Sequence, residues 1–271
     1  MAKNDTPNLD AIISELKTSL DAGVELGNFR FKELSYDQQR RLLNSNTSPA
    51  EYPAVVGNLL NDFIAECVEY TDDIVDVRKT VTIIQKPFLL NKLRELNFGT
   101  SHKENGIEYE MYKVKEEDFD ITVEPKTIER AGLTINLRVP ALAVDTHFNK
   151  ILVSALSNYK GKRAANITEI ESGELLLKYQ LYELMKYIES FEFNGQKFDF
   201  TDMLPRSCVD FMNVLKAPIV KEIAKYHNEV QNASKKAITF YGTSSDDTLE
   251  LPNYIEFFIL DMEQDLESVN I

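Results

Sequence analysis

Residues 174–200, ELLLKYQLYELMKYIESFEFNGQKFDF, contain the clearest structural pattern in this chain. Apolar residues recur at helical spacing in the first half, which predicts a long helix with Ser172 as its N-cap. The stripe consists of Leu177, Leu181, Leu184 and Ile188. The dipeptide Asn194-Gly195 then predicts a tight β-hairpin, because both positions accept positive φ angles. A second long helix, over residues 217–236, completes a helix–hairpin–helix unit.

Four phenylalanines make the predicted hairpin a packing unit. A two-residue loop would pair Phe193 with Gln196 and Phe191 with Phe198. Because side chains alternate along a strand, four rings would then share one face. These rings belong to Phe191, Phe193, Phe198 and Phe200. Burying each ring would contribute roughly 1.5–3 kcal/mol, so we expect the flanking helices to cover this face.

The first 100 residues predict helices with recognisable start signals. The earliest helix has an apolar stripe running from Leu9 to Leu20. Ser35 and Gln38 form a capping box before the next helix, and Ser48 and Glu51 form another before a helix that runs to about residue 68. We therefore expect this part of the chain to be helical.

The middle of the chain changes to a strand pattern. Residues 107–114, 119–125 and 133–142 alternate between apolar and polar side chains, which predicts three strands. Ala131-Gly132 is suited to a turn before the last of them. A helical pattern returns over residues 144–156.

These patterns predict an α+β fold that is mainly helical, with a small central antiparallel sheet and the C-terminal helix–hairpin–helix unit. The chain divides into an N-terminal helical region (residues 1–100), a small β region (101–142) and a C-terminal region with an acidic tail (143–271). One continuous domain is the alternative, since 271 residues suit one large domain or two modest ones.

Composition restricts the class of protein. An apolar content of 43% is that of a globular protein. The N-terminus has no apolar segment of the secretory type, and no apolar run is long enough to span a membrane. The only cysteines, Cys67 and Cys208, are far apart in sequence and suggest a reducing compartment, although two cysteines could form one bridge.

The net charge of −14 is concentrated in two windows that lack Lys and Arg. One lies between Arg41 and Arg78 and contains seven acids, and the other follows Lys236 and contains eight. A negative surface repels phosphates, so nucleic acid is not expected as a partner. The windows are either solvated faces or docking sites for basic surfaces of a partner protein.

A search for catalytic and metal-binding patterns finds none. The three histidines form no HxH or HExxH pattern, and there is no GxSxG or GxGxxG motif. Cys208 and His227 could approach each other between helices, but a packed thiol and a surface imidazole are the simpler interpretation. We therefore expect no catalytic residue, cofactor or metal ligand, and no enzyme activity.

The C-terminal tail is the exception to this plain composition. A dense apolar run over residues 254–260 is followed directly by acids. Folded back, the run would be core; left exposed, it would suit a groove or sheet edge of a partner. The candidate partner contacts are Tyr254, Phe257, Phe258, Asp261, Glu263 and Asp265.

The order of YQLYELMKYI, ESFEFNGQKFDF, TDMLPRS and a following helix resembles the base plate protein family of T-even-like contractile-tailed bacteriophages. LSYDQQRRLL (residues 34–43) and QKPFLLNKLR (85–94) are also similar. The resemblance implies a late phage protein that forms the central baseplate hub, or assists its assembly, through contacts with other hub proteins. It brings no active-site motif, and it implies a location in the host cytoplasm during assembly and in the virion baseplate if the protein stays there.

Two other functions stay open. A dedicated chaperone would assist hub assembly and be absent from the mature virion, and an enzyme of unrecognised type would need a pocket with converging polar groups. The sequence specifies neither the oligomeric state nor the partner.

Overall fold

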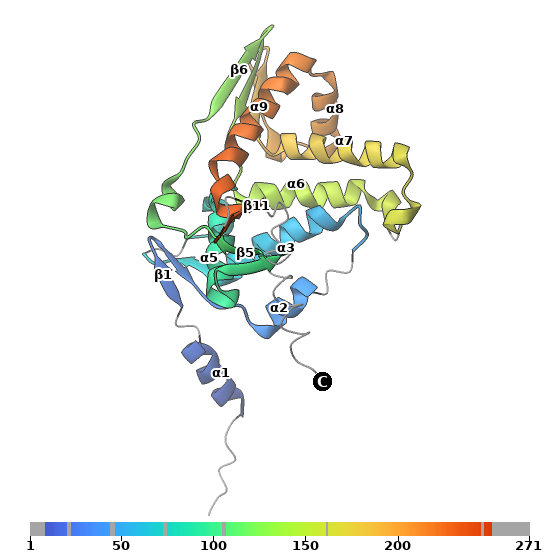
Figure 1. The fold of residues 1–271 in the computed structure, drawn as a ribbon. Helices are drawn as coiled ribbons and strands as arrows, with labels where there is room; N and C mark the ends of the chain where they lie inside the picture. The colour runs from blue at the N-terminus through green and yellow to red at the C-terminus, as the bar shows by residue number, and fades with distance from the viewer. Residues whose placement is uncertain are drawn as a thin grey trace, which may run out of the picture.

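The computed structural model describes residues 9–20, 23–43, 47–72, 75–104, 107–160, 162–244 and 247–250. Within these ranges the chain has the predicted α+β fold, with helices packed around three antiparallel sheets (Figure 1). The prediction of one small central sheet is therefore wrong in its arrangement. Among the described residues, no helix is both long enough and apolar enough to cross a lipid bilayer.

The predicted hairpin forms two strands of a sheet with the order β6-β7-β8-β9. Its strands are β6 (Lys126–Arg130), β7 (Leu133–Leu137), β8 (Ile188–Phe193) and β9 (Gln196–Asp199). Both predicted turns are confirmed, since Ala131-Gly132 and Asn194-Gly195 adopt positive φ angles. The β8–β9 hairpin therefore extends the central β region instead of forming a separate unit, because β8 pairs with β7 over Leu133–Phe193 to Leu137–Ile188.

The second sheet joins distant parts of the chain in the order β11-β10-β5-β4. Its strands are β4 (Ser101–Glu104), β5 (Ile107–Met111), β10 (Thr239–Gly242) and β11 (Thr248–Glu250). The predicted strand over 119–125 is wrong: residues 116–120 form a 3₁₀ turn and 121–125 have no regular structure. Phe119 packs instead on Phe29, with ring centroids 4.9 Å apart, so its burial belongs to the N-terminal core.

The third sheet is N-terminal, with the order β1-β2-β3. It is formed by β1 (Val24–Leu26), β2 (Phe29–Phe31) and β3 (Val68–Tyr70). Before it lies α1 (Leu9–Leu20), whose apolar residues Leu9, Ile12, Ile13 and Leu16 are exposed. Between β2 and β3 comes first α2 (Tyr36–Leu43), and the predicted Ser35–Gln38 capping box is confirmed by reciprocal backbone-to-side-chain hydrogen bonds.

The longer helices form layers (Figure 1). In chain order they are α3 (Tyr52–Cys67), the single turn α4 (Val77–Thr80), α5 (Gln85–Phe98), α6 (Leu142–Ala155), α7 (Glu169–Met185), α8 (Pro205–Val214) and α9 (Ala217–Ala233). Ser48 donates a hydrogen bond to Glu51 at 2.7 Å, but α3 begins at Tyr52, one residue after Glu51. Two cores result: α3 and α5 pack with the β1–β3 sheet and the β11-β10-β5-β4 sheet, and α6 to α9 pack on β6–β9.

Three predictions for the helix–hairpin–helix unit are wrong in detail. The N-cap of α7 is Thr168, which forms a capping box with Glu171, and not Ser172. Ile188 lies in β8, and Leu177 is exposed, because the buried face of α7 runs through Leu175, Tyr182 and Met185. The predicted helix 217–236 ends at Ala233, and a separate helix, α8, precedes it.

Candidate functional site

An apolar groove of about 380 Å³ lies where the β6–β9 sheet extends past the helices that cover it. Leu133, Phe191 and Phe193 line it from the sheet, and Phe211, Val214 and Leu215 line it from the end of α8. The α8–α9 connection contributes Lys216, and α9 contributes Ile219. We refer to this surface as the hairpin groove.

The alternation of the strands explains why the groove is apolar. The cross-strand pairs Phe191–Phe198 and Phe193–Gln196 are those that the two-residue loop predicted. Phe191 lies 4.1 Å from Phe211 of α8 and 5.0 Å from Phe198, measured between ring centroids. On the opposite face, Asn136 donates to Ser190 at 3.1 Å, so that side of the sheet is polar.

The expectation that helices cover all four hairpin rings is only partly correct. Phe200 follows β9 in a short 3₁₀ turn and is fully buried against Phe148. Phe193 stays 47% exposed and Phe198 is exposed as well, because α8 ends at Val214 before it reaches the tip of the hairpin. Val214 itself is 69% exposed. Exposed apolar side chains around a hollow are typical of protein-binding surfaces.

The charge of the hairpin groove is opposite to that of the chain. Its only charged lining residues among those described are Arg130 and Lys216, both exposed, and no carboxylate lines it. This contrasts with the net charge of −14 of the whole protein. A ligand with apolar side chains next to acids would therefore match the groove better than a basic one would.

A second hollow, of about 250 Å³, contains a buried ionic cluster. Asp145 of α6 lies 2.7 Å from Lys186 and 3.2 Å from Lys86 of α5. Asn61 of α3 donates to the same carboxylate at 2.8 Å, and Lys186 also pairs with Glu183 of α7 at 2.5 Å. Two cations and two carboxylates therefore compensate each other inside the protein.

The pKa shifts in this cluster indicate an ion-pair role. Burial alone would raise the pKa of Asp145, but Lys186 and Lys86 outweigh it and hold that pKa well below its usual range. Burial would lower the pKa of Lys186, but Asp145 and Glu183 raise it. A general base near neutral pH needs a raised carboxyl pKa, and a lysine nucleophile needs a lowered one. The pKa of Asp145 is lowered and that of Lys186 is raised, so both shifts are opposite to those that catalysis would need.

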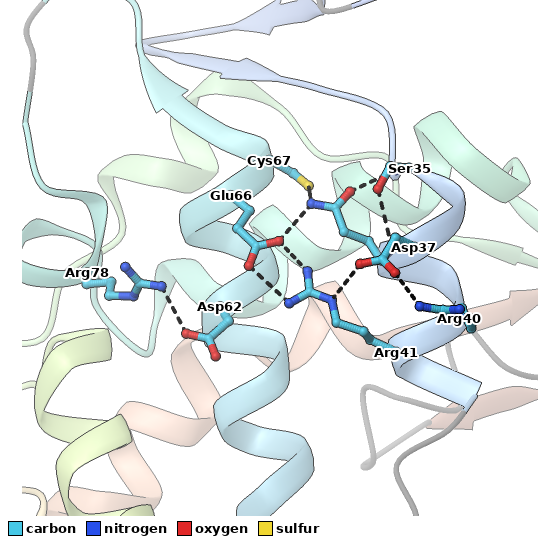
Figure 2. A network of polar contacts seen from close by, with 9 residues as sticks. Ser35, Asp37, Arg40, Arg41, Asp62, Glu66, Cys67 and Arg78 are labelled. Atoms are coloured by element: carbon cyan, nitrogen blue, oxygen red, sulfur yellow. Dashed lines mark hydrogen bonds and ion pairs between the residues drawn. The ribbon is translucent and has the colours of Figure 1, made fainter. Parts of the chain in front are cut away.

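The first acidic window is largely paired within the protein. Figure 2 shows Arg41 between Asp37 of α2 and Glu66 of α3, with Arg78 reaching Asp62. Burial would raise the pKa of Glu66, but hydrogen bonds from Arg41 and Gln38 lower it overall. Four acids of the window pair with cations of this chain: Asp62 with Arg78, Glu66 with Arg41, Glu69 with Lys32 and Asp76 with Lys79.

This pairing favours the solvated-face interpretation of the window. Arg41 and Arg78 mark the two ends of the window in sequence, and both fold back onto it. Each exposed pair contributes only about 0–1 kcal/mol to stability, but together the pairs reduce the negative charge that a basic partner would meet.

Several residues singled out from the sequence have ordinary positions. Cys208 is buried and lies 3.5 Å from the carbonyl oxygen of Phe200, and burial raises its pKa to about 11. His227 packs on the ring of Tyr187, 5.1 Å away. Within the described part of the chain, no group of three or more His, Cys, Asp or Glu residues could hold a metal. Tyr254, Phe257, Phe258, Asp261, Glu263 and Asp265 lie outside the described residues.

The sequence analysis singled out Phe191 and Phe193 but missed the other residues that define the two hollows. Asp145 and Lys186 each interrupt an apolar stretch, in LAVDTHF and LMKYI, and a charge in such a place signals a buried pair. Val214 and Lys216 precede Pro218, where a break between helices could have been expected. Comparisons of the chain with protein-family models, curated protein sequences and solved structures return no match.

Proposed function

We propose that this protein is a non-enzymatic phage tail protein that forms the central baseplate hub, or assists its assembly, through protein–protein contacts. The observation that supports contact as its mode of action is the hairpin groove, where Phe193 and Val214 stay exposed beside an apolar hollow. The sequence resemblance is the reason for naming the baseplate hub as the assembly to which this protein contributes. The host cytoplasm is its location during assembly, and the virion baseplate is its location if it remains a subunit.

The hairpin groove has the composition of a binding hot spot. Binding energy in protein interfaces concentrates on a few aromatic residues in apolar pockets. Here the exposed ring of Phe193 stands beside Phe191 and Phe211, which are already held in place by stacking on each other. A partner side chain entering the groove would bury apolar surface without moving these two rings.

An assembly chaperone is the alternative within the same class. A chaperone would use the same kind of surface but would leave the finished particle. Mass spectrometry of purified virions separates the two, because a hub subunit is present in them and a chaperone is absent.

An unrecognised enzyme is the alternative from another class, and the buried ionic cluster would be its site. We do not favour it, because Asp145 and Lys186 are held in their charged forms by each other. Groups held in this way neither donate nor accept protons near neutral pH.

The test is affinity capture of hub proteins of the same phage by this protein carrying a tag. We expect the wild-type chain to retain at least one of them and the Phe193→Ala variant to bind it about tenfold or more weakly, which is the scale of a hot-spot truncation. Tyr241→Ala is the matched control, because Tyr241 is also an aromatic strand residue and is 45% exposed but lies outside the groove. If no hub protein binds the wild-type chain, the proposal is wrong.

A further inference from the structure

We infer that the hairpin groove is the docking site for this chain's own C-terminal segment, residues 257–265, within the same molecule. The inference depends on the groove and on the sequence of the tail, and not on the phage assignment. It can therefore fail or succeed independently of the proposed function.

The chemistry of the segment matches that of the groove. Residues 257–260, FFIL, supply two aromatic and two aliphatic side chains, which suit a hollow formed by Phe191, Phe193 and Phe211. Asp261, Glu263 and Asp265 follow at once, and no Lys or Arg occurs after Lys236. Arg130 and Lys216 at the groove are the charges that such a segment would need.

The end of the described chain lies within reach of the groove. Glu250 pairs with Thr239 in the sheet and forms an ion pair with Lys235 at 2.9 Å, directly after α9 ends at Ala233. The groove lies at the other end of α9, next to Lys216 and Ile219. Figure 1 shows α9 running between the α8 end of the molecule and β11.

The lengths of the helix and the tail agree. The 17 residues of α9 correspond to about 25 Å at a rise of about 1.5 Å per residue. Phe257 and Leu260 are seven and ten residues beyond Glu250. An extended chain of these lengths spans at most roughly 24–35 Å, at about 3.4 Å per residue. The end of the apolar run, from Phe257 onward, and the acids after it can therefore reach the groove from Glu250 when the chain is extended, without any change in the described fold.

The groove should bind the tail of its own molecule and not the tail of a second copy, because a tethered segment has the higher local concentration. A tethered segment acts at an effective concentration on the order of mM when the tether can span the distance. A second copy at micromolar protein concentration cannot compete with that unless its own tail is prevented from binding. Docking would also cover Phe193 and Val214 in the free protein, so any partner that uses the groove would first displace the tail.

Disulfide mapping in the full-length chain tests the inference. The double variant Val214→Cys/Gln264→Cys places one thiol at the groove and one among the acids of the tail, within reach of each other, and it retains every apolar and acidic residue of the tail. Cys67 and Cys208 are each 1% exposed, so the engineered thiols are the reactive ones. Ile170→Cys/Gln264→Cys is the matched control, because Ile170 is an exposed β-branched residue like Val214, at 78% exposure, and lies outside the groove.

Mild oxidation should link residues 214 and 264 within the monomer at least about tenfold faster than it links the control pair. Peptide mapping identifies the bond, and size-exclusion chromatography shows whether it lies within one chain. Dimers joined through the same bond would overturn docking within one molecule in favour of a second copy. Equal rates for the two pairs, or no bond, would overturn docking altogether.

A charge-reversal variant tests the role of the cations at the groove. Lys216→Glu together with Arg130→Glu, in the Val214→Cys/Gln264→Cys chain, should slow the linking severalfold at low salt, because the acids of the tail would then meet acids. Both side chains are exposed, so the fold should tolerate the change. An unchanged rate would overturn the assignment of these cations as the partners of the tail.

Discussion

Lys186, which follows α7, lies 2.7 Å from Asp145 of α6, and both side chains are only 7% exposed. The other oxygen of the same carboxylate meets Lys86 of α5 at 3.2 Å and Asn61 of α3 at 2.8 Å. Four segments far apart in sequence therefore meet at one carboxylate. This explains why charged residues interrupt otherwise apolar helices here.

Asp145→Asn should destabilise the protein by about 3–5 kcal/mol, because it leaves two buried lysines without their shared anion. Urea unfolding followed by circular dichroism measures the free energy of unfolding. Glu229→Gln is the control, since Glu229 pairs with Lys126 on the surface and its loss should cost about 1 kcal/mol or less. Similar small losses in both variants would contradict a structural role for the buried pair.

The contribution of Asp145 should also depend on pH. Its pKa in the folded state lies below the unfolded value of about 4. The stabilisation is therefore fully present above that value and is lost as the pH falls towards the folded pKa. The difference in unfolding free energy between the wild type and Asp145→Asn should stay constant from about pH 6 to pH 8 and shrink below about pH 4. A difference that is the same at pH 3 and pH 7 would argue against this linkage.

The two cysteines should be unreactive in the native protein. Burial raises the pKa of both Cys67 and Cys208 to about 11, and the thiolate is the reactive form. With Ellman's reagent near pH 8, we expect no fast reaction in buffer and two reactive thiols in denaturant. Because Cys67 and Cys208 are both free, the reduced and untreated proteins should give the same result. One rapidly titrating thiol in buffer would contradict the packing described for it.

Replacing Gly173 or Gly132 by alanine should change the stability of the protein in opposite directions. Gly173 lies inside α7, and an added Cβ would meet nothing within 4 Å, so Gly173→Ala should stabilise the protein by about 0.5–1 kcal/mol. An added Cβ at Gly132 also meets nothing, but its φ angle is +77°, so Gly132→Ala should destabilise by about 1–2 kcal/mol. Thermal unfolding of the two variants compares them. A shift of the same sign in both would contradict the stated backbone conformations.

Local patterns predicted the local elements well. The register of β8 with β9 followed from Asn194-Gly195, because a two-residue turn leaves one pairing for the flanking strands. Ser35 and Gln38 marked the start of α2 because their side chains bond to backbone groups three residues away. In both cases the partners are close neighbours in sequence.

Patterns that depend on distant partners were less informative. Residues 119–125 alternate like a strand, but Phe119 packs against Phe29 and the segment pairs with no strand. The sheet that joins β5 to β10 brings Tyr109 opposite Gly242, and nothing near either residue indicates the other. The hairpin groove was missed for the same reason, because it depends on where α8 ends relative to the tip of the β8–β9 hairpin.

The sequence alone determined the positions of most helices, the two glycine turns, the cross-strand pairs of the hairpin and the distribution of charge, because each depends on residues within a few positions of one another. Only the tertiary structure decided which strands share a sheet, that Arg41 and Arg78 neutralise part of the acidic window, and that Asp145 and Lys186 meet. It also decided that Phe193 and Val214 stay exposed. These outcomes depend on the packing of segments that are far apart in sequence, as in the pairing of Tyr109 of β5 with Gly242 of β10. Apolar burial, which drives such packing, has no preferred sequence partner.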